Sequence, residues 1–158
     1  MESNATSALE TAGLARRLAA ILYDTLLVAA LLVVASALVT LPVQMGLGVK
    51  LNPAHPLFRG YLALVILGFY LYFWTHGGQT LGMNAWRLRL VRRDGRPPGI
   101  ADALRRWGAA WLSLLPLGLG FLWAVVDREG LMWHDRWSGT HVVLLPGDDS
   151  PRPPRTVK

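Results

Sequence analysis

The fold of this chain is decided by residues 16–39, which read RRLAAILYDTLLVAALLVVASALV. The stretch is almost wholly apolar, yet it begins with two arginines and contains one carboxylate, Asp24. The apolar run covers residues 14–41 and exceeds the roughly 20 residues that an α-helix needs to cross a bilayer. We therefore expect a transmembrane helix over 14–41 that ends at Pro42.

The composition of the whole chain agrees with a membrane protein. Hydrophobic residues make up 53% of the 158 residues and charged residues only 16%, whereas about a quarter of a soluble domain is charged. The first run is longer than the apolar core of a secretory signal, about 7–15 residues, and more apolar segments follow it. A retained helix is therefore favoured. The absence of cysteine from the sequence excludes disulfides, thiolate metal sites and a cysteine nucleophile.

Two more apolar runs follow, FRGYLALVILGFYLYFWT at 58–75 and WGAAWLSLLPLGLGFLWAVV at 107–126. The second run carries a belt of aromatic residues at one end, which is typical of a membrane interface. The third is long enough to cross, but Pro116, Gly118 and Gly120 could kink it or turn it into a re-entrant hairpin. We expect it to cross because its hydropathy is the stronger signal, and the hairpin remains the alternative.

The basic residues predict the orientation in the membrane and the partners. The net charge is +6, and seven arginines lie between residues 76 and 106, whereas only Lys50 and Arg59 lie between the first two runs. We expect the chain to lie in the inner (plasma) membrane of the cell. The positive-inside rule then places the N-terminus and the 76–106 loop in the cytoplasm. Anionic lipid headgroups fit these residues better than nucleic acid. The arginines expected to contact headgroups are Arg16, Arg87, Arg89, Arg92 and Arg93.

Two short segments predict a strand element on the cytoplasmic side. Residues 86–91, WRLRLV, alternate apolar and basic side chains before an Asp-Gly turn, and residues 140–146, THVVLLP, are rich in β-branched side chains. The two could form a ribbon. If the third run crosses, they lie on opposite sides of the membrane, whereas a hairpin returns the chain to the same side.

The fold class expected is thus an all-α integral membrane protein with three apolar helical segments and one short cytoplasmic ribbon. We expect a polar N-terminal segment over 1–13, a single membrane domain over 14–145, and a disordered, proline-rich tail over 146–158.

Asp24 requires an explanation, because an unpaired carboxylate within the hydrocarbon costs about 2.5–3.5 kcal/mol. Arg17 projects from nearly the same helix face but lies about 10 Å away along the axis, too far for a direct pair. Each side chain therefore needs a partner elsewhere. Asp24 should face the protein interior. It is expected either to bind a proton or an ion, or to form an ion pair between helices with Arg105 or Arg106.

A second polar cluster lies at 127–145, DREGLMWHDRWSGTHVVLL. A Ser/His/Asp catalytic set would require side chains that diverge along the chain to converge, and the histidine spacing matches no standard metal pattern. A proton-handling pair of His134 and Asp135 is possible, since imidazole titrates near neutral pH. The pattern favours a plainer alternative, a turn in which Asp135 pairs with an arginine. We expect no enzymatic activity, no bound metal and no cofactor.

Three elements occur together and in order: an arginine and an aspartate in the first helix, GGQTLGM…LRLVRRDG from residue 77, and HDRWSGTHVV from residue 134. This set resembles the RDD family of small bacterial membrane proteins, named for one arginine and two aspartates. The family arginine falls on Arg17 and its first aspartate on Asp24. The second best matches Asp135, with Asp127 as the alternative.

The resemblance implies a multi-spanning membrane protein. Some members look like cation/proton antiporters, and RDD-like segments elsewhere look like assembly modules of membrane complexes. Two functions are therefore expected. The first is proton-linked cation exchange, in which Asp24, Arg17, Asp135 and His134 are the candidate residues and a homo-oligomer encloses the pathway. The second is a non-catalytic scaffold or accessory subunit that binds a membrane partner protein.

Overall fold

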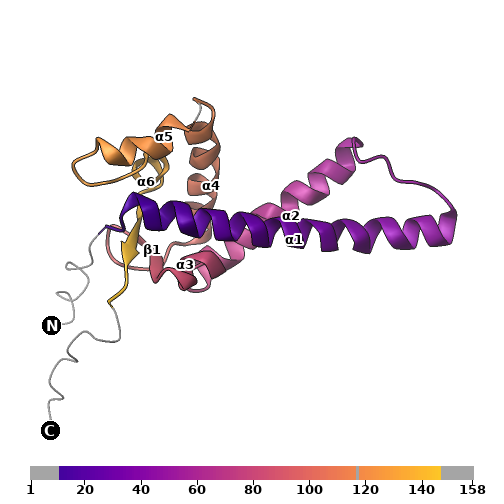
Figure 1. Cartoon of the computed structure of the whole chain (residues 1–158), viewed down its shortest axis with the longest axis horizontal. Coiled ribbons are helices and arrows are strands. Elements are labelled where there is room, and N and C mark those ends of the chain that lie inside the picture. Colours follow the sequence, from indigo (N-terminus) through magenta and orange to yellow (C-terminus); the bar gives the residue numbers. More distant parts are fainter. Residues whose placement is uncertain (1–10, 117, 147–158) are drawn as a thin grey trace, which may run out of the picture.

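The computed structural model describes residues 11–116 and 118–146, most of which are helical. The expected polar N-terminal segment, except for its last three residues, and the expected tail after Pro146 lie outside the described residues. The elements follow in the order shown in Figure 1: α1 (Leu14–Leu47), α2 (Pro56–Thr75), α3 (Leu81–Ala85), β1 (Leu88–Arg92), α4 (Ile100–Leu114), α5 (Leu119–Leu122), the 3₁₀ helix η2 (Trp123–Val125), α6 (Trp133–Ser138) and β2 (Thr140–Leu144).

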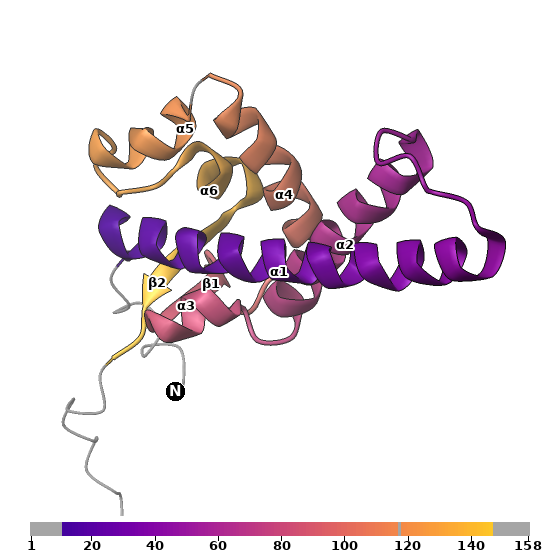
Figure 2. The same cartoon turned by 45° about the vertical axis from the view of Figure 1, so that its right-hand side comes forward.

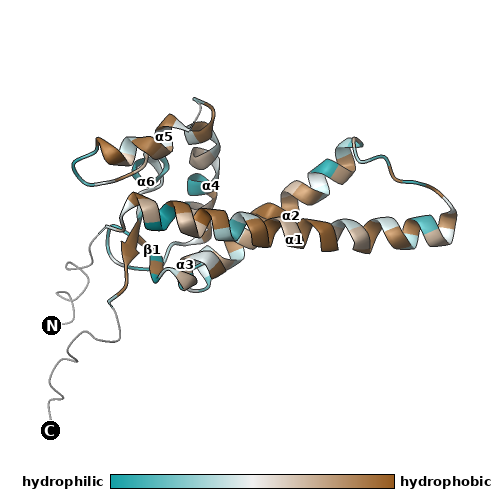
Figure 3. Ribbon diagram, viewed as in Figure 1, coloured by the Kyte–Doolittle hydropathy of each residue, from teal (hydrophilic) through white to brown (hydrophobic). Residues whose placement is uncertain are grey.

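Helices α1 and α2 are both long and apolar enough to cross a membrane. Their large apolar side chains point outward: Leu22, Leu26, Val33 and Leu38 of α1 are all more than half exposed, as is Leu64 of α2. Apolar residues accordingly cover both helices along most of their length (Figure 3). Water would penalise such a surface, whereas lipid would not. The predicted membrane character of these two segments is therefore supported by the structure.

The first helix is longer than its sequence predicted. Pro42 lies inside α1, and the helix continues to Leu47, where Gly48 adopts a left-handed conformation and donates its N–H to the carbonyl of Gln44. The expectation that Pro42 ends the helix was wrong. Proline removes one backbone hydrogen bond, but in an apolar surrounding a helix still satisfies more backbone groups than an irregular chain does.

The two predicted strands form the expected ribbon. β1 and β2 pair antiparallel, with Leu88 opposite Leu144 and Arg92 opposite Thr140. The start of the described chain joins them, since Thr11 forms a bridge with Val143. The ribbon lies below the first turns of α1, beside α3 (Figure 2). The chain segments just before α1, after α3 and after α6 therefore lie next to one another.

This pairing bears on the expectation that the third apolar run crosses the membrane. A single crossing over 107–126 would carry β2 to the opposite side from β1, which the ribbon excludes. The run is also not one helix: α4 begins at Ile100, and the axis turns by 108° between α4 and the α5–η2 segment. The mid-run proline and glycines break the helix instead of merely kinking it. The pairing of β1 with β2 thus favours the re-entrant alternative.

The packed core lies at one end of the molecule. Ala20, Trp74, Met83, Leu90 and Val142 belong to it, and they come from elements far apart in the chain. The shorter elements gather around the first half of α1, while the distal half of α1 extends away together with the start of α2 (Figure 1). All polar groups discussed below lie in or beside this core.

Candidate functional site

Asp135 on α6 is the centre of a buried charge cluster. Its side chain is fully buried, and its two oxygens accept hydrogen bonds from Arg17 Nη1 at 2.8 Å and Arg106 Nη1 at 2.7 Å. The backbone N–H of Met132 donates to Asp135 Oδ2 at 3.0 Å. The prediction that Asp135 pairs with an arginine is confirmed, with two arginines instead of one. One carboxylate thereby ties together α1, α4 and α6.

The two guanidinium groups make further contacts that fix them in place. Arg17 Nη2 donates to the carbonyl of Val142 at 3.3 Å, and Arg106 Nη1 also donates to Thr140 Oγ1 at 2.9 Å. Burial alone would raise the pKa of Asp135, but the positive charges of Arg106 and Arg17 outweigh burial and lower this pKa below its usual value. Asp135 is therefore ionised at neutral pH and fully engaged.

His134 lies beside this cluster and is also buried. Its ring packs against Phe121 at 4.9 Å between centroids, and its Nε2 is 3.7 Å from Asp135 Oδ1. Burial, together with the charge of Arg106, lowers the pKa of His134 to about 3. The imidazole is therefore neutral at pH 7, which argues against a His134–Asp135 pair that exchanges protons near neutral pH.

Asp24 faces the protein interior, as expected, but its partners are not arginines. Its Oδ2 accepts a hydrogen bond from Thr80 Oγ1 at 2.5 Å, and its Oδ1 accepts one from the backbone N–H of Gly82 at 2.8 Å. The alternative in which Asp24 forms an ion pair with Arg105 or Arg106 was therefore wrong. Arg106 binds Asp135 instead, and Arg105 binds Asp102, which accepts the N–H of Gly99 at the start of α4.

The partners of Asp24 belong to the GGQTLGM stretch. Thr80 is the N-cap of α3, where its hydroxyl also accepts the N–H of Met83 at 3.2 Å. Gly82 is required by packing, because a Cβ at this position would lie 2.4 Å from the carbonyl oxygen of Ala20 and 2.8 Å from Asp24 Oδ1. The contact between this stretch and Asp24 was not predicted from the sequence. The glycine and threonine directly after an apolar helix were the available signal.

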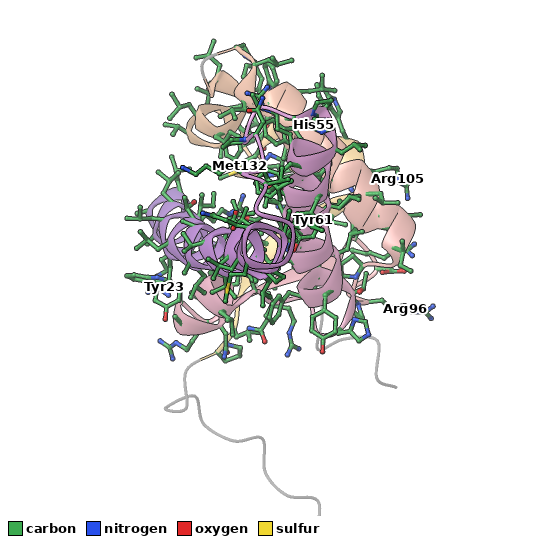
Figure 4. All side chains as sticks on the ribbon, turned by 90° about the vertical axis from the view of Figure 1, so that its right-hand side faces the viewer. Tyr23, His55, Tyr61, Arg96, Arg105 and Met132 are labelled. Atoms are coloured by element: carbon green, nitrogen blue, oxygen red, sulfur yellow. The ribbon has the colours of Figure 1, made fainter. Side chains whose placement is uncertain are left out.

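A cavity of about 500 Å³ lies beside both groups of charges. Its wall comes from α1, α2, α4 and the α5–α6 region, with Met132 between α1 and the α5–α6 region (Figure 4). Most lining residues are apolar or aromatic. The polar side chains that line the cavity are Arg17, Asp24, Thr25, Tyr70, Thr80, Arg106 and His134. Among the described residues, Asp24 is the only acidic one in the wall.

The arginines predicted to contact headgroups lie on the surface. Arg16, Arg87, Arg89, Arg92 and Arg93 are all exposed, at the start of α1 and around β1. Arg92 lies 3.5 Å from Asp102, and Arg96 and Arg105 also project away from the protein (Figure 4). Within the described part of the chain, no three histidine or acidic side chains gather as they would around a metal ion.

Two long apolar helices with exposed apolar side chains, together with a buried arginine–aspartate cluster, are typical of a small membrane protein. The RDD family model matches residues 11–139, and the chain belongs to the RDD family. The resemblance expected from the sequence is thus confirmed, and its three named residues, Arg17, Asp24 and Asp135, all lie buried in the core region. Comparisons with curated proteins and with solved structures gave no match.

Proposed function

We propose that this RDD protein exchanges protons for a cation across the plasma membrane, with Asp24 as the carboxylate that binds either one. The observation that carries this proposal is the position of Asp24. It is the one acidic side chain in the wall of a cavity bounded by α1 and α2, and its hydrogen-bond partners are uncharged. The proposal assigns no catalytic chemistry to the chain.

The geometry of Asp24 leaves room for a ligand. A carboxylate can accept about four hydrogen bonds, and Thr80 and Gly82 supply one to each oxygen. These donors fix the orientation of the carboxylate, while its remaining lone pairs can accept a proton or contact a cation from the cavity. A single carboxylate holds one or the other, so binding of the cation releases the proton.

The Arg17–Asp135–Arg106 cluster has a different role in this proposal. Asp135 accepts three hydrogen bonds, and the two arginines among its donors already balance its negative charge, so it offers a cation little attraction. Its role is to hold α1 against α4 and α6, which keeps the cavity open beside Asp24.

The proposed orientation places the packed end of the molecule in the cytoplasm. The exposed arginines lie at that end, near the start of α1, where the cytoplasmic leaflet supplies anionic headgroups. α1 and α2 each cross the membrane, and α4–α5 enters and leaves from the same side. Two crossing helices enclose little space, so a homo-oligomer completes the pathway.

A scaffold or accessory subunit of a membrane complex is the second candidate. It is favoured by the observation that Asp24 and Asp135, which are both buried, have structural partners: Asp135 joins three helices, and Asp24 joins α1 to α3. In that case the charges specify one arrangement of the helices, and the surface binds another membrane protein.

Liposomes that contain the purified full chain and a pH-sensitive dye distinguish the two candidates. Under the exchange proposal, a gradient of Na⁺, K⁺ or Li⁺, or of an organic cation, changes the internal pH, and Asp24→Asn abolishes the change. Asp94→Asn, which removes an exposed carboxylate outside the cavity, serves as the matched control and retains exchange. A folded wild-type protein that moves no protons with any of these cations supports the scaffold.

A further inference from the structure

We infer that the cavity beside Asp24 binds an organic cation with an apolar body, and not a bare metal ion. This inference rests on the proposed exchange at Asp24 and names the class of its substrate. Three properties of the cavity carry it: the small number of oxygen ligands near Asp24, the aromatic wall, and the position of the two arginines.

The wall offers few oxygens to a metal ion. Hard cations take about six or more oxygen ligands in protein sites. Besides Asp24, the side-chain oxygens in the wall are the hydroxyls of Thr25, Thr80 and Tyr70. The Thr80 hydroxyl already donates to Asp24, and the Thr25 hydroxyl donates to the carbonyl of Ile21 at 2.7 Å. One carboxylate with these hydroxyls is too sparse a set to replace the hydration shell of a metal ion.

The volume and the wall suit a larger ligand. A cavity of about 500 Å³ falls within the roughly 300–1,000 Å³ that small-molecule sites occupy. Two aromatic pairs form much of its wall: Tyr70 with Trp74 on α2, at 5.1 Å between centroids, and Trp107 with Trp111 on α4, at 5.8 Å. Aromatic faces bind quaternary ammonium and similar cations through their π electrons while also contacting apolar groups.

The cavity already contains one contact of this kind. The guanidinium carbon of Arg106 lies 5.6 Å from the ring centroid of Trp74. That ring is therefore engaged, and Phe121 packs against His134. Tyr70, Trp107 and Trp111 are the other phenol and indole side chains in the wall, and they remain for a ligand. The wall thus combines one carboxylate with three aromatic rings, which is the pairing of groups that recognises an organic cation.

The arginines set the orientation of the ligand. Arg17 and Arg106 are both bound to Asp135, so their positive charge stays at one end of the cavity. Asp24 lies seven residues beyond Arg17 on α1, about 10 Å along the axis. Repulsion from the arginines and attraction to Asp24 place the cationic group of the ligand at the Asp24 end, with its apolar body against Trp107 and Trp111.

Binding of two probes of matched size and opposite charge tests the inference. The full chain in phosphatidylcholine nanodiscs is titrated with tetraphenylphosphonium and with tetraphenylborate, and binding to empty nanodiscs is subtracted. We expect saturable binding of tetraphenylphosphonium only. Asp24→Asn and Trp107→Leu should each weaken it by about tenfold, because the first removes the charge that attracts the cationic centre and the second removes an aromatic contact with the phenyl groups. Asp94→Asn, on an exposed carboxylate, should leave it unchanged.

Three results would overturn the inference. The first is tetraphenylphosphonium binding that Asp24→Asn and Trp107→Leu both leave unchanged, which indicates partition into lipid. The second is saturable tetraphenylborate binding that Arg106→Gln removes, which indicates an anion site. The third is no binding of tetraphenylphosphonium at all. If Asp24→Asn does not fold, Trp107→Leu, which preserves an apolar side chain in the wall, decides the matter alone.

The same preparation separates this inference from the proposed function. Exchange of protons for Na⁺ or K⁺ that depends on Asp24, without binding of tetraphenylphosphonium, contradicts the substrate class and leaves the exchange intact. Binding of tetraphenylphosphonium that depends on Asp24, without proton movement in liposomes, supports the site and contradicts the exchange.

Discussion

Arg17 and Asp135 are separated by 118 residues in the chain and form a buried ion pair with a nitrogen–oxygen distance of 2.8 Å. Arg17 belongs to the first helix and Asp135 to the last, so this pair connects the two ends of the membrane domain. Removing one partner of a buried pair leaves the other charge without compensation, which is more costly than the pair itself is favourable.

Arg17→Ala should therefore destabilise the protein severely, by about 3–5 kcal/mol. The adjacent Arg16→Ala is the matched control, because Arg16 is exposed and its loss should change stability by no more than about 0.5 kcal/mol. Thermal unfolding of both variants in detergent measures the difference. Equal stability of the two variants would show that the buried pair contributes nothing to the fold.

The contact between α1 and α3 should depend on the absence of a side chain at residue 82. Gly82→Ala places a methyl group 2.4 Å from the Ala20 carbonyl oxygen, and the helices must separate to accept it. We expect a marked loss of folded protein, measured by size-exclusion chromatography after extraction. Gly108→Ala, within α4, introduces a methyl group with no neighbour within 4 Å and should leave the yield unchanged or raise it.

The hydroxyl of Thr80 bonds to both Asp24 and the N–H of Met83. Thr80→Val keeps the volume but loses both hydrogen bonds, and it should cost about 1–3 kcal/mol of stability. Thr80→Ser keeps the hydroxyl and should recover most of this loss. Comparison of the two unfolding midpoints checks the prediction. A Thr80→Ser variant as unstable as Thr80→Val would attribute the effect to the methyl group.

The re-entrant path of α4–α5 predicts which residues share a side of the membrane. The natural chain has no cysteine, so single cysteines can be introduced at Asn52, Asp94 and Pro146 without background. We expect Asp94→Cys and Pro146→Cys to react from the cytoplasmic side and Asn52→Cys from the outside. Labelling with a membrane-impermeant maleimide on intact cells measures this. Reaction of Pro146→Cys from the outside would restore a third crossing.

Acid should destabilise the protein through His134. The unfolded pKa of histidine is 6.5 and the folded pKa of His134 is about 3, so between these pH values only the unfolded chain binds the proton. Stability from this group is complete above about pH 6.5 and falls by about 2 kcal/mol on going to pH 5.

His134→Gln should flatten this pH dependence. The pKa of His141 is also lowered, first by burial, so it contributes in the same direction, and His141→Gln measures its share. Asp135 titrates below this window because its pKa is lowered from an already acidic value. An unchanged slope between pH 5 and 7 in the double variant would assign the acid sensitivity to other groups.

The sequence predicted those features that depend on local pattern. The apolar runs, the period of two in residues 86–91 and the β-branched stretch at 140–146 gave two long helices and both strands. The prediction that the helix ends at Pro42 was wrong because it used the cost of a proline inside a helix in water. In an apolar surrounding, leaving the helix exposes more unsatisfied backbone groups than the proline does. The path of the third run depended on the pairing of β1 with β2, and hydropathy alone carries no information about that contact.

The site was predicted only in part for a similar reason. Arg17, Asp24 and Asp135 were identified because charges in or beside apolar runs are rare and need partners. Which partner each one takes is decided by packing: Gly82 lets α3 approach Asp24, and Arg106 is the one of two adjacent arginines that faces the core. Residue type alone does not distinguish Arg105 from Arg106, whereas the helix face does.

The bridge between Thr11 and Val143 and the ion pair between Arg17 and Asp135 both join the beginning of the domain to its end, which has a consequence for the synthesis of the chain. At about 5–20 residues per second, the ribosome needs roughly 6–24 s to add the residues between Arg17 and Asp135. During this interval α1 can enter the membrane, but Arg17 has no carboxylate to bind. The assembly closes only when the end of the domain has been made and joins its beginning. Prematurely terminated chains therefore retain an uncompensated arginine, which gives cellular quality control a physical basis for distinguishing them from complete ones.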